Sequence, residues 1–229
     1  FVDLTSRADL FLRSSTLGVS AGLGAIGSMT AFAEAGLGQD VDSGIVLINN
    51  VEIVSRQLNA LADLITDMFV DTTAGGGGGF VAIGAVSHVR DNTTSEISVG
   101  SNTQIEADGV NLSARASREM DGNADANSFA AASGAGAKLN LYANGDARVN
   151  FLTGNGRSKI TGTSVQIDTY NKVYKEAVVS TNGVPAKVAS NVSSGSGNLA
   201  GVTVIGTDAT VGTDSDKSRS AISLGDLWI

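Results

Sequence analysis

The chain has 229 residues and a formal net charge of −8, with 29 glycines, one proline and no cysteine. The lack of any Lys/Arg cluster argues against nucleic-acid binding, and the lack of cysteine excludes disulfides, thiolate metal sites and a Cys nucleophile. Aromatic residues make up 5% and charged residues 17% of the chain. Both fractions are low for a compact enzyme and predict a thin core of small and β-branched side chains.

Alternating segments recur along the chain and predict β-strands. In each segment apolar residues occupy every second position, which is the pattern of a strand with one buried face. Gly, Asn, Asp or Ser bound the segments, as expected for turns. The segments begin at Val2, Val51, Val110 and Val165 and recur about every 50 to 60 residues.

Two further markers recur in the same order at a similar spacing. Isoleucine steps follow polar runs, and clusters of small residues lie between the steps. Three markers in phase predict an internal repeat, because a chain this rich in Gly, Ala and Ser could produce one marker by chance. The steps are Ile97, Ile160 and Ile222, and the clusters centre on Gly24, Gly77, Gly134 and Gly195.

Many short strands with a long repeat favour a solenoid over a sandwich or a barrel. We therefore predict an all-β fold, a right-handed parallel β-helix (β-solenoid) in which like residues stack above like. Each repeat is expected to divide into roughly three coils of ordinary β-helix size. The chain 1–229 is predicted to be one solenoid segment cut from a longer array, with about four imperfect repeats at approximately 1–50, 51–109, 110–164 and 165–229.

Two stretches interrupt the strand pattern. Residues 55–69 place Leu58, Leu61 and Ile65 at helical spacing, which predicts a short helix that either caps a coil or forms an inserted partner-binding element. The run from Gly75 to Gly79 is interpreted as a flexible turn between coils. A phosphate-binding loop is the weaker interpretation, because no Lys-Ser/Thr pair follows the run.

Residues suited to catalysis are scarce. His88 is the only histidine, so a Ser-His-Asp site would need it as the base, and we interpret it as a surface or groove residue on a strand. Carboxylates for glycoside cleavage could approach one another across coils, but no pair stands out. The candidates were Asp121, Asp125, Asp146 and Asp168. We therefore predict that the chain is not an enzyme and assign no catalytic, cofactor-binding or metal-binding residue.

Two short segments carry oxygen ligands at alternate positions, as the start of a calcium loop does. They are Asp121/Asn123/Asp125 and Asp214/Asp216. Neither has the bidentate Glu that such a loop needs near its end, and the nonapeptide repeat of calcium-binding β-rolls is missing. Solvated loop carboxylates are the favoured interpretation, so we predict no cofactor, with calcium as the alternative.

Residues 93–116 contain a Thr-rich edge, the step Ile97-x-x-Gly100, the turn Ile105-x-Ala107-x-Gly109 and an alternating strand, and a small-residue cluster follows at 130–137. This order resembles the repeat of giant bacterial filamentous adhesins, which include the leukotoxin-family filamentous adhesins and haemagglutinin-like β-helix proteins. The resemblance implies export to the outer surface, a β-helical stalk, and a role in adhesion, cohesion or filament formation. Residues 55–69 and the loop around Pro185 depart from the pattern.

The leading prediction is a structural, non-catalytic segment of a bacterial cell-surface or extracellular fibre or adhesin, which forms filaments and mediates adhesion or cell–cell cohesion. The alternative is a glycan-binding or glycan-cleaving β-helix of the tail-spike or lyase type, and an ice-binding solenoid ranks last because the threonines are scattered. Expected partners are the chain itself, through end-to-end stacking or neighbouring repeats, and surface glycans or other cells. No apolar run approaches the ~20 residues that a membrane-spanning helix needs.

Overall fold

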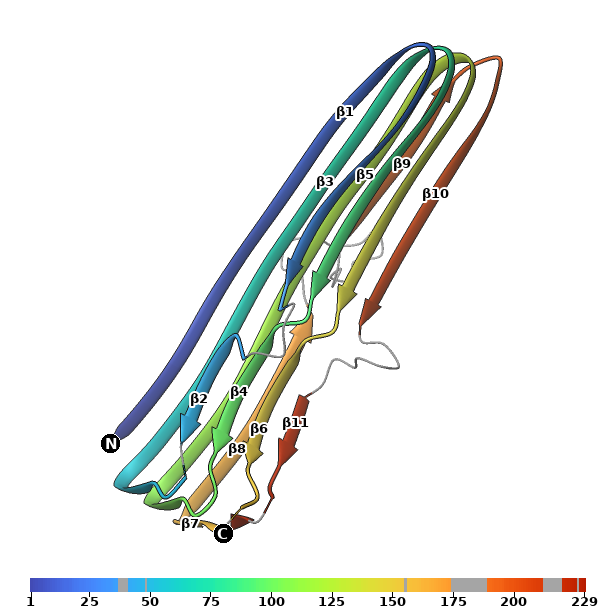
Figure 1. The fold of residues 1–229 in the computed structure, drawn as a ribbon. Coiled ribbons are helices and arrows are strands. Elements are labelled where there is room, and N and C mark those ends of the chain that lie inside the picture. The colour runs from blue at the N-terminus through green and yellow to red at the C-terminus, as the bar shows by residue number, and fades with distance from the viewer. Residues whose placement is uncertain (37–40, 48, 155, 174–188, 212–219, 226) are drawn as a thin grey trace, which may run out of the picture.

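The computed structural model describes residues 1–229 except 37–40, 48, 155, 174–188, 212–219 and 226. Within the described residues every regular element is a β-strand. All strand pairs are parallel, and the long strands lie side by side in a stack (Figure 1). The predicted all-β fold is confirmed, and the arrangement is that of a β-solenoid.

Each layer of the stack is a long, narrow circuit of the chain. A long strand rises, reverses at the tip and returns, and a short strand continues the returning limb (Figure 1). Layer one contains β1 (Val2–Ala35) and β2 (Ser43–Leu47), layer two β3 (Glu52–Asp91) and β4 (Thr94–Val99), and layer three β5 (Gln104–Ala143) and β6 (Asp146–Phe151). Layer four contains β7 (Ser158–Thr161), β8 (Ser164–Val173), β9 (Ala189–Gly197), β10 (Ala200–Val211) and β11 (Ser220–Ser223), and β12 (Leu227–Trp228) follows it.

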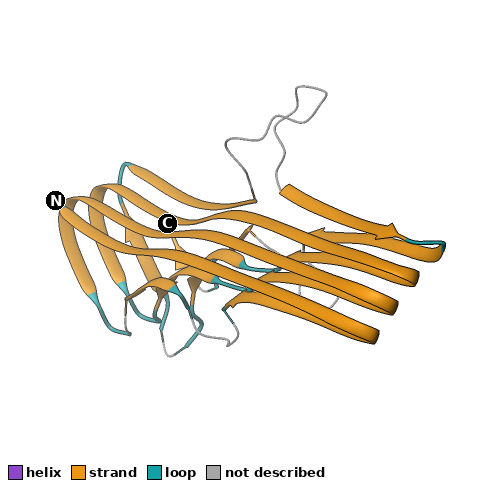
Figure 2. Ribbon diagram, turned by 90° about the horizontal axis from the view of Figure 1, so that it is seen from above, coloured by secondary structure: helices purple, strands orange, loops and turns teal. Residues whose placement is uncertain are grey.

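Two sheets form the walls of the stack. One eight-stranded sheet joins β1, β3 and β5, each with its rising and its returning limb, to β7, β8, β9, β10 and β12, and a four-stranded sheet of β2, β4, β6 and β11 continues the returning limbs. Viewed from above, the rising and returning limbs form two facing walls with a narrow space between them (Figure 2). Side chains that point between the walls form the core.

One circuit uses a whole repeat, so the prediction of three coils per repeat is wrong. Val2 pairs with Leu58, Leu58 with Val110, and Val110 with Val165. The chain therefore returns to the same place in the cross-section only once per repeat. Alternation along a strand reveals which face is buried, but it carries no information about where the strand bends.

The register also corrects the first sequence marker. Leu58, and not Val51, lies opposite Val2 and Val110. Many inward positions carry Val, Ile, Leu or Ala, so several alignments of the alternating pattern look alike. The register of a strand is decided by how well all of its inward side chains are buried. A match of five residues does not contain that information.

The other two markers were partly misaligned for the same reason. Val149 lies between Ile97 and Ile222 in the stack, whereas Ile160 pairs with Ile105 in the other sheet. In the small-residue clusters, Gly77 lies opposite Ala21 and Phe129, and not opposite Gly24 or Gly134.

The predicted helix at 55–69 is wrong, because these residues lie inside strand β3. Leu58, Leu64 and Met68 point inward and are fully buried, whereas Leu61 and Ile65 lie on the outer face. The alanines between the large inward residues complete a period of two that the helical count overlooked. Pairing with β1 and β5 over the whole segment outweighs its modest intrinsic preference for helix.

The run from Gly75 to Gly79 makes the reversal at the tip of layer two, within one coil and not between coils. A Cβ on Gly78 would collide with the carbonyl oxygen of Gly22 in layer one, and a Cβ on Gly79 would lie 2.8 Å from the carbonyl oxygen of Leu23. Glycine is therefore needed here because the backbones of two layers approach too closely for side chains.

Asparagine ladders hold the corners of neighbouring layers. Asn50 and Asn102 adopt positive φ values of 61° and 56°, which Asn tolerates better than most residues. The Asn102 side chain donates a 2.8 Å hydrogen bond to Asn50, and Asn144 donates one of 3.2 Å to Asn92. Stacked amides of this kind give each corner its own inter-layer bond.

A buried polar network interrupts the core, whose apolar residues form three clusters. Asp91 and Arg118 are both fully buried, with 3.2 Å between Arg118 Nε and Asp91 Oδ2. Asp91 also accepts hydrogen bonds from the Thr66 hydroxyl (2.5 Å) and the Thr93 amide (2.8 Å), and Arg118 donates to the Thr93 carbonyl (2.6 Å) and to Asn171. Arg118 belongs to layer three, and its guanidinium thus contacts residues of both layer two and layer four.

Candidate functional surfaces

Outward-facing side chains form columns that cross the layers, because equivalent positions of successive layers are paired. One such column runs through Arg7, Asp63, Arg115 and Tyr170, so that opposite charges alternate over the first three layers. The surface chemistry of this protein is therefore set by the register between layers and not by any local motif.

A polar hollow of about 540 Å³ lies on the rising limb of layers two to four. It brings Asp63, Arg115 and Asp168 together with the half-exposed ring of Tyr170. Asp168 was named from the sequence, whereas Asp63 and Arg115 were missed. They would have been found only by aligning the repeats in the observed register. The remaining lining residues are Ser113, Ser117 and Thr169.

The other carboxylates considered for glycoside cleavage lie elsewhere. Asp121 and Asp125 are on the rising limb of β5, outside the residues that line the hollow. Asp146 begins β6 in the second sheet, where its Oδ2 lies 3.8 Å from Arg148 Nη1. The fold therefore distributes these acids over separate surfaces.

The calcium candidates Asp121, Asn123 and Asp125 lie on one extended strand. Alternate residues of a strand are roughly 7 Å apart, so their oxygens follow a line and do not wrap around one point. Asp125 instead accepts a hydrogen bond from the Ser193 hydroxyl of layer four. Among the residues the structure describes, no group of three or more His, Asp or Glu side chains could hold a metal. Asp214 and Asp216 lie outside the described residues.

His88 belongs to a ladder of rings on the returning limbs. Its ring centroid lies 5.6 Å from that of Phe32 and 5.4 Å from that of Tyr142, and its Nε2 is 3.3 Å from Glu34 Oε1. Tyr142 donates a 3.0 Å hydrogen bond to Asp208. Burial and the Asp208 carboxylate both raise the pKa of Tyr142 above its ordinary value. These contacts link residues of four successive layers, although Tyr142 lies two positions along the strand from Asn140, the residue that pairs with His88 and Asp208.

Glu96 is the centre of a polar cluster on the second sheet. Arg148 and Asn150 of layer three donate hydrogen bonds to its two carboxylate oxygens, and Ser98 donates another. Burial by itself would raise the pKa of Glu96, but these hydrogen bonds and the positive charge of Arg148 lower it below the ordinary value of 4.5. The charged form of Glu96 therefore binds layer two to layer three.

We expect Glu96→Gln to weaken the acid sensitivity of the protein. Because the folded-state pKa of Glu96 is below 4.5, its charge stabilises the native state above that pH, and the contribution is lost as the pH falls through the folded pKa. Free energies of unfolding measured by denaturation between pH 3 and 7 should fall less steeply in the variant. The exposed Glu106→Gln serves as the control, and equal slopes for the wild type and Glu96→Gln would contradict the assignment.

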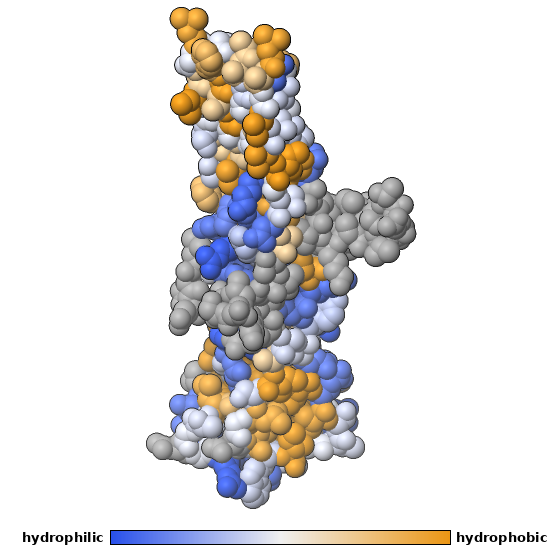
Figure 3. All heavy atoms as spheres, turned by 90° about the vertical axis from the view of Figure 1, so that its right-hand side faces the viewer, coloured by the Kyte–Doolittle hydropathy of each residue, from blue (hydrophilic) through white to orange (hydrophobic). Residues whose placement is uncertain are grey.

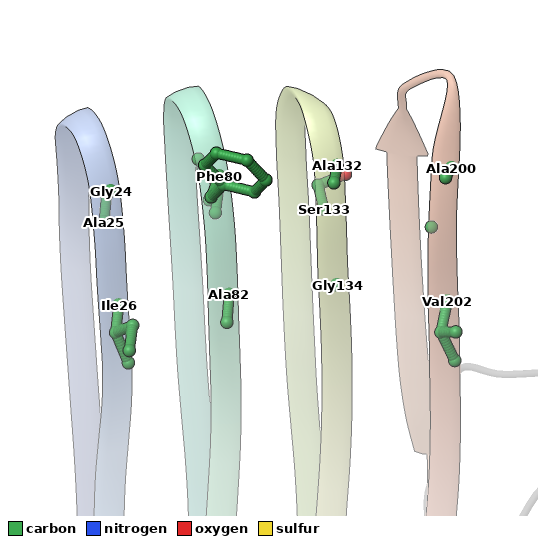
Figure 4. Close-up of a pocket in the computed structure, with 12 residues that line it drawn as sticks. Gly24, Ala25, Ile26, Phe80, Ala82, Ala132, Ser133, Gly134, Ala200 and Val202 are labelled. Carbon is green, nitrogen blue, oxygen red and sulfur yellow. The ribbon is translucent and has the colours of Figure 1, made fainter.

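The tip of the stack carries no charged side chain in layers one and two. No Asp, Glu, Lys or Arg occurs between Arg13 and Glu34 of layer one or between Asp71 and Arg90 of layer two. A shallow hollow of about 720 Å³ crosses all four layers here. Figure 4 shows Ile26, Phe80 and Val202 projecting beside a floor of Gly and Ala residues.

The described strands at both ends of the stack are paired on one edge only. Among the described residues, β1 pairs only with β3, and β8, β9 and β10 pair only with β5. Inward residues that are sealed in the middle layers are therefore uncovered at the ends: Ile97 and Val149 are fully buried, whereas Ile222 in the same column is 45% exposed. Figure 3 views the layer-four end, where apolar atoms gather at the tip and again near the foot.

No family model, curated protein or solved structure matches the chain. None of the described residues forms a helix that is long and apolar enough to cross a membrane.

Proposed function

We propose that this chain is a structural, non-catalytic segment of a bacterial cell-surface or extracellular fibre or adhesin. The observation that carries the proposal is the stacking of equivalent residues through four layers, in which the outer edges of β1 and of β8, β9 and β10 are unpaired among the described residues. A stack in which each layer contacts only its neighbours can be extended by more layers without changing its cross-section. The resemblance of residues 93–116 to filamentous adhesin repeats supports a location outside the bacterial cell.

A mechanical role is favoured by the length of the paired strands. β1 pairs with β3 from Val2 to Ala35, and β3 pairs with β5 from Glu52 to Asp91. Such continuous ladders of parallel hydrogen bonds resist separation along the stack, while the outer columns remain available for contacts with other cells. Self-association is the expected route to cohesion, because open strand edges are templates for further pairing.

Electron microscopy of the chain over a range of concentrations tests the proposal. We expect rods of constant width whose length grows with concentration, and a fibre diffraction reflection at ~4.7–4.8 Å along the rod axis. Isolated particles of four layers at every concentration would overturn it.

Leu4→Lys is expected to abolish rod growth while leaving the single segment folded. Leu4 points inward on β1 but is only partly buried, because no described strand covers that edge. A lysine there can reach water in the free segment, whereas another layer would bury its charge, and inward charges are a known means of blocking edge pairing. Thr5→Lys places the same charge on the adjacent outward position and should leave growth intact. Sedimentation measures growth and circular dichroism the fold; equal growth by both variants would contradict the prediction.

A glycan-binding role is the second candidate, and the polar hollow favours it. Tyr170 offers an aromatic face beside the hydrogen-bonding groups of Asp63, Arg115 and Asp168. An oligosaccharide array with Tyr170→Ala tests this role, and Phe129→Ala, which removes an exposed ring outside the hollow, is the matched control. Binding that is absent, or equal in the two variants, removes the candidate. The glycan-cleaving version remains an alternative with no pair of acids assigned to it.

A further inference from the structure

We propose that the outer face of the returning limbs binds a long-chain fatty acid, with the acyl chain in the apolar hollow near the tip and the carboxylate at Lys138. The hollow has a volume of about 720 Å³ and is lined by residues of all four layers. It lies on the side of the stack and not at an end, so neighbouring layers do not cover it. The site is therefore independent of filament formation.

The floor of the hollow is made of small residues of layer three. Ala132 and Gly134 line it, and Gly136 is the next residue on the same face of the returning limb of β5. A Cβ on Gly134 or Gly136 would lie 3.8 Å from its nearest neighbour, a carbonyl oxygen of β10, and neither glycine has a positive φ. Unlike Gly78, these glycines are not required by close packing or by backbone conformation. Their effect is to leave an open trough, which consists of Ala132, Gly134 and Gly136.

Larger apolar side chains border the trough on both sides. Phe80 of layer two pairs with Ala132, and Val202 and Val204 of layer four pair with Gly134 and the glycine that follows it. All three large side chains are mostly exposed. Figure 4 shows Ala132 and Gly134 between Phe80 and Val202. A chain of methylene groups on this floor would contact apolar atoms beneath it and on both sides, and it would remove them from water.

Lys138 lies at the end of the trough that is farther from the tip. It is the next outward residue after Gly136, and its Cγ is 3.7 Å from the place where a Cβ on Gly206 of layer four would be. Among the described residues Lys138 forms no ion pair. Asp208 lies one outward position farther along β10 than Gly206, and it accepts a 3.0 Å hydrogen bond from Tyr142 on the side away from the trough. The ammonium group of Lys138 can therefore receive an anionic head group.

The order of these features favours a long-chain carboxylate. The strand covers about 20 Å from Ala132 to Lys138, which is close to the length of an extended palmitate. An apolar trough that ends at a cation matches an apolar chain that ends in an anion. No Asp, Glu, Lys or Arg occurs between Asp125 and Lys138, so a second charge on the ligand would find no partner on this limb.

An extended peptide fits the same surface poorly. The returning limb of β5 pairs with β3 on one edge and with β10 on the other, so its backbone groups are already hydrogen-bonded. A peptide lying on the trough would lose water from its own amides and carbonyls without gaining partners, which costs free energy. A saturated acyl chain carries no such groups.

Filling the trough tests the site. Equilibrium dialysis with radiolabelled palmitate, at concentrations where palmitate is monomeric, should show saturable binding to the wild type. Gly136→Val should lower the affinity at least about tenfold, because the valine occupies the space of several methylene groups. Gly75→Val is the matched control, since it lies on the rising limb and a Cβ there would be 4.0 Å from its nearest neighbour. It should leave the affinity unchanged.

Removing the charge tests the position of the head group. Lys138→Met should weaken palmitate binding about fivefold, as expected for one exposed ion pair, and should not change the binding of methyl palmitate, which has no charge. Lys159→Met, at an exposed lysine of β7, should affect neither ligand. Equal affinities of the wild type for palmitate and its methyl ester, or an unchanged affinity in Lys138→Met, would overturn the assignment of the carboxylate.

Circular dichroism confirms that each variant is folded, and sedimentation gives its state of association. The site is overturned if palmitate does not bind saturably or binds equally to the wild type and Gly136→Val. It is also overturned if Gly136→Val reduces binding to phosphatidylcholine vesicles that contain no fatty acid, because the surface is then a membrane contact. Loss of a dimer in Gly136→Val would assign the surface to a second copy instead. Each of these results leaves the proposed function standing, because rod growth is measured separately.

Discussion

Asp91→Ala is expected to lower the free energy of unfolding by about 3–5 kcal/mol, because it leaves the fully buried guanidinium of Arg118 without its counter-charge. The variant also deprives Thr66 and the Thr93 amide of their acceptor, and an unpaired buried donor adds to the cost. Chemical denaturation followed by circular dichroism measures the effect.

Two comparisons separate this explanation from a general effect of losing a carboxylate. Asp67→Ala removes a carboxylate that lies 3.7 Å from the exposed Arg13, and exposed pairs contribute only about 0–1 kcal/mol. Adding Arg118→Met to Asp91→Ala should recover part of the loss, because the uncompensated charge is then removed. A cost for Asp91→Ala no larger than that for Asp67→Ala would show that the network does not hold the layers together.

Leu139→Ala is expected to cost about 2–5 kcal/mol, as usual for a buried leucine that leaves a cavity. Leu139 is fully buried, and its Cδ1 lies 2.5 Å from the place where a Cβ on Gly122 would be. The leucine of the returning limb therefore fills the space left by the glycine of the rising limb. Leu23→Ala, at a side chain that is 91% exposed, should change the stability by no more than about 0.5 kcal/mol.

A double-mutant cycle tests this contact between the two walls. Gly122→Ala alone should cost about 1–3 kcal/mol through overpacking. Combined with Leu139→Ala it should cost less than the sum of the two, with a coupling of about 1 kcal/mol, because the shortened side chain makes room for the new methyl group. Strict additivity would mean that the two walls do not interlock at this position.

Several local features could be predicted because their causes are local. The alternation of apolar and polar residues predicts strands, and a thin core follows from the abundance of alanine and glycine. The long period predicts stacking, since residues that recur in a repeat protein occupy equivalent places. The positive φ of Asn102 is a local requirement of its turn, whereas Gly78 is required by the approach of Gly22 in the neighbouring layer.

The helix expected at 55–69 shows where local reasoning failed. Leu58, Leu61 and Ile65 fit a helical spacing, whereas Leu58, Leu64 and Met68 fit a spacing of two that the intervening alanines help to complete. The strand is chosen over the helix because β1 and β5 form backbone hydrogen bonds with this segment on both of its edges. Of the surface residues, Asp168 was noticed without its neighbours, because Asp63 and Arg115 reach the hollow only through the register of three layers.

The sequence by itself therefore determined the class of the fold, the existence of a repeat and the chemical character of the core, because a period of two and a long period are properties of the chain. Only the tertiary structure decided that one circuit takes a whole repeat, which residues share a column, and that Asp91 meets Arg118 inside the stack. Those outcomes depend on burying all of the inward side chains of long strands simultaneously. A comparison of short segments cannot show which register buries all of these side chains.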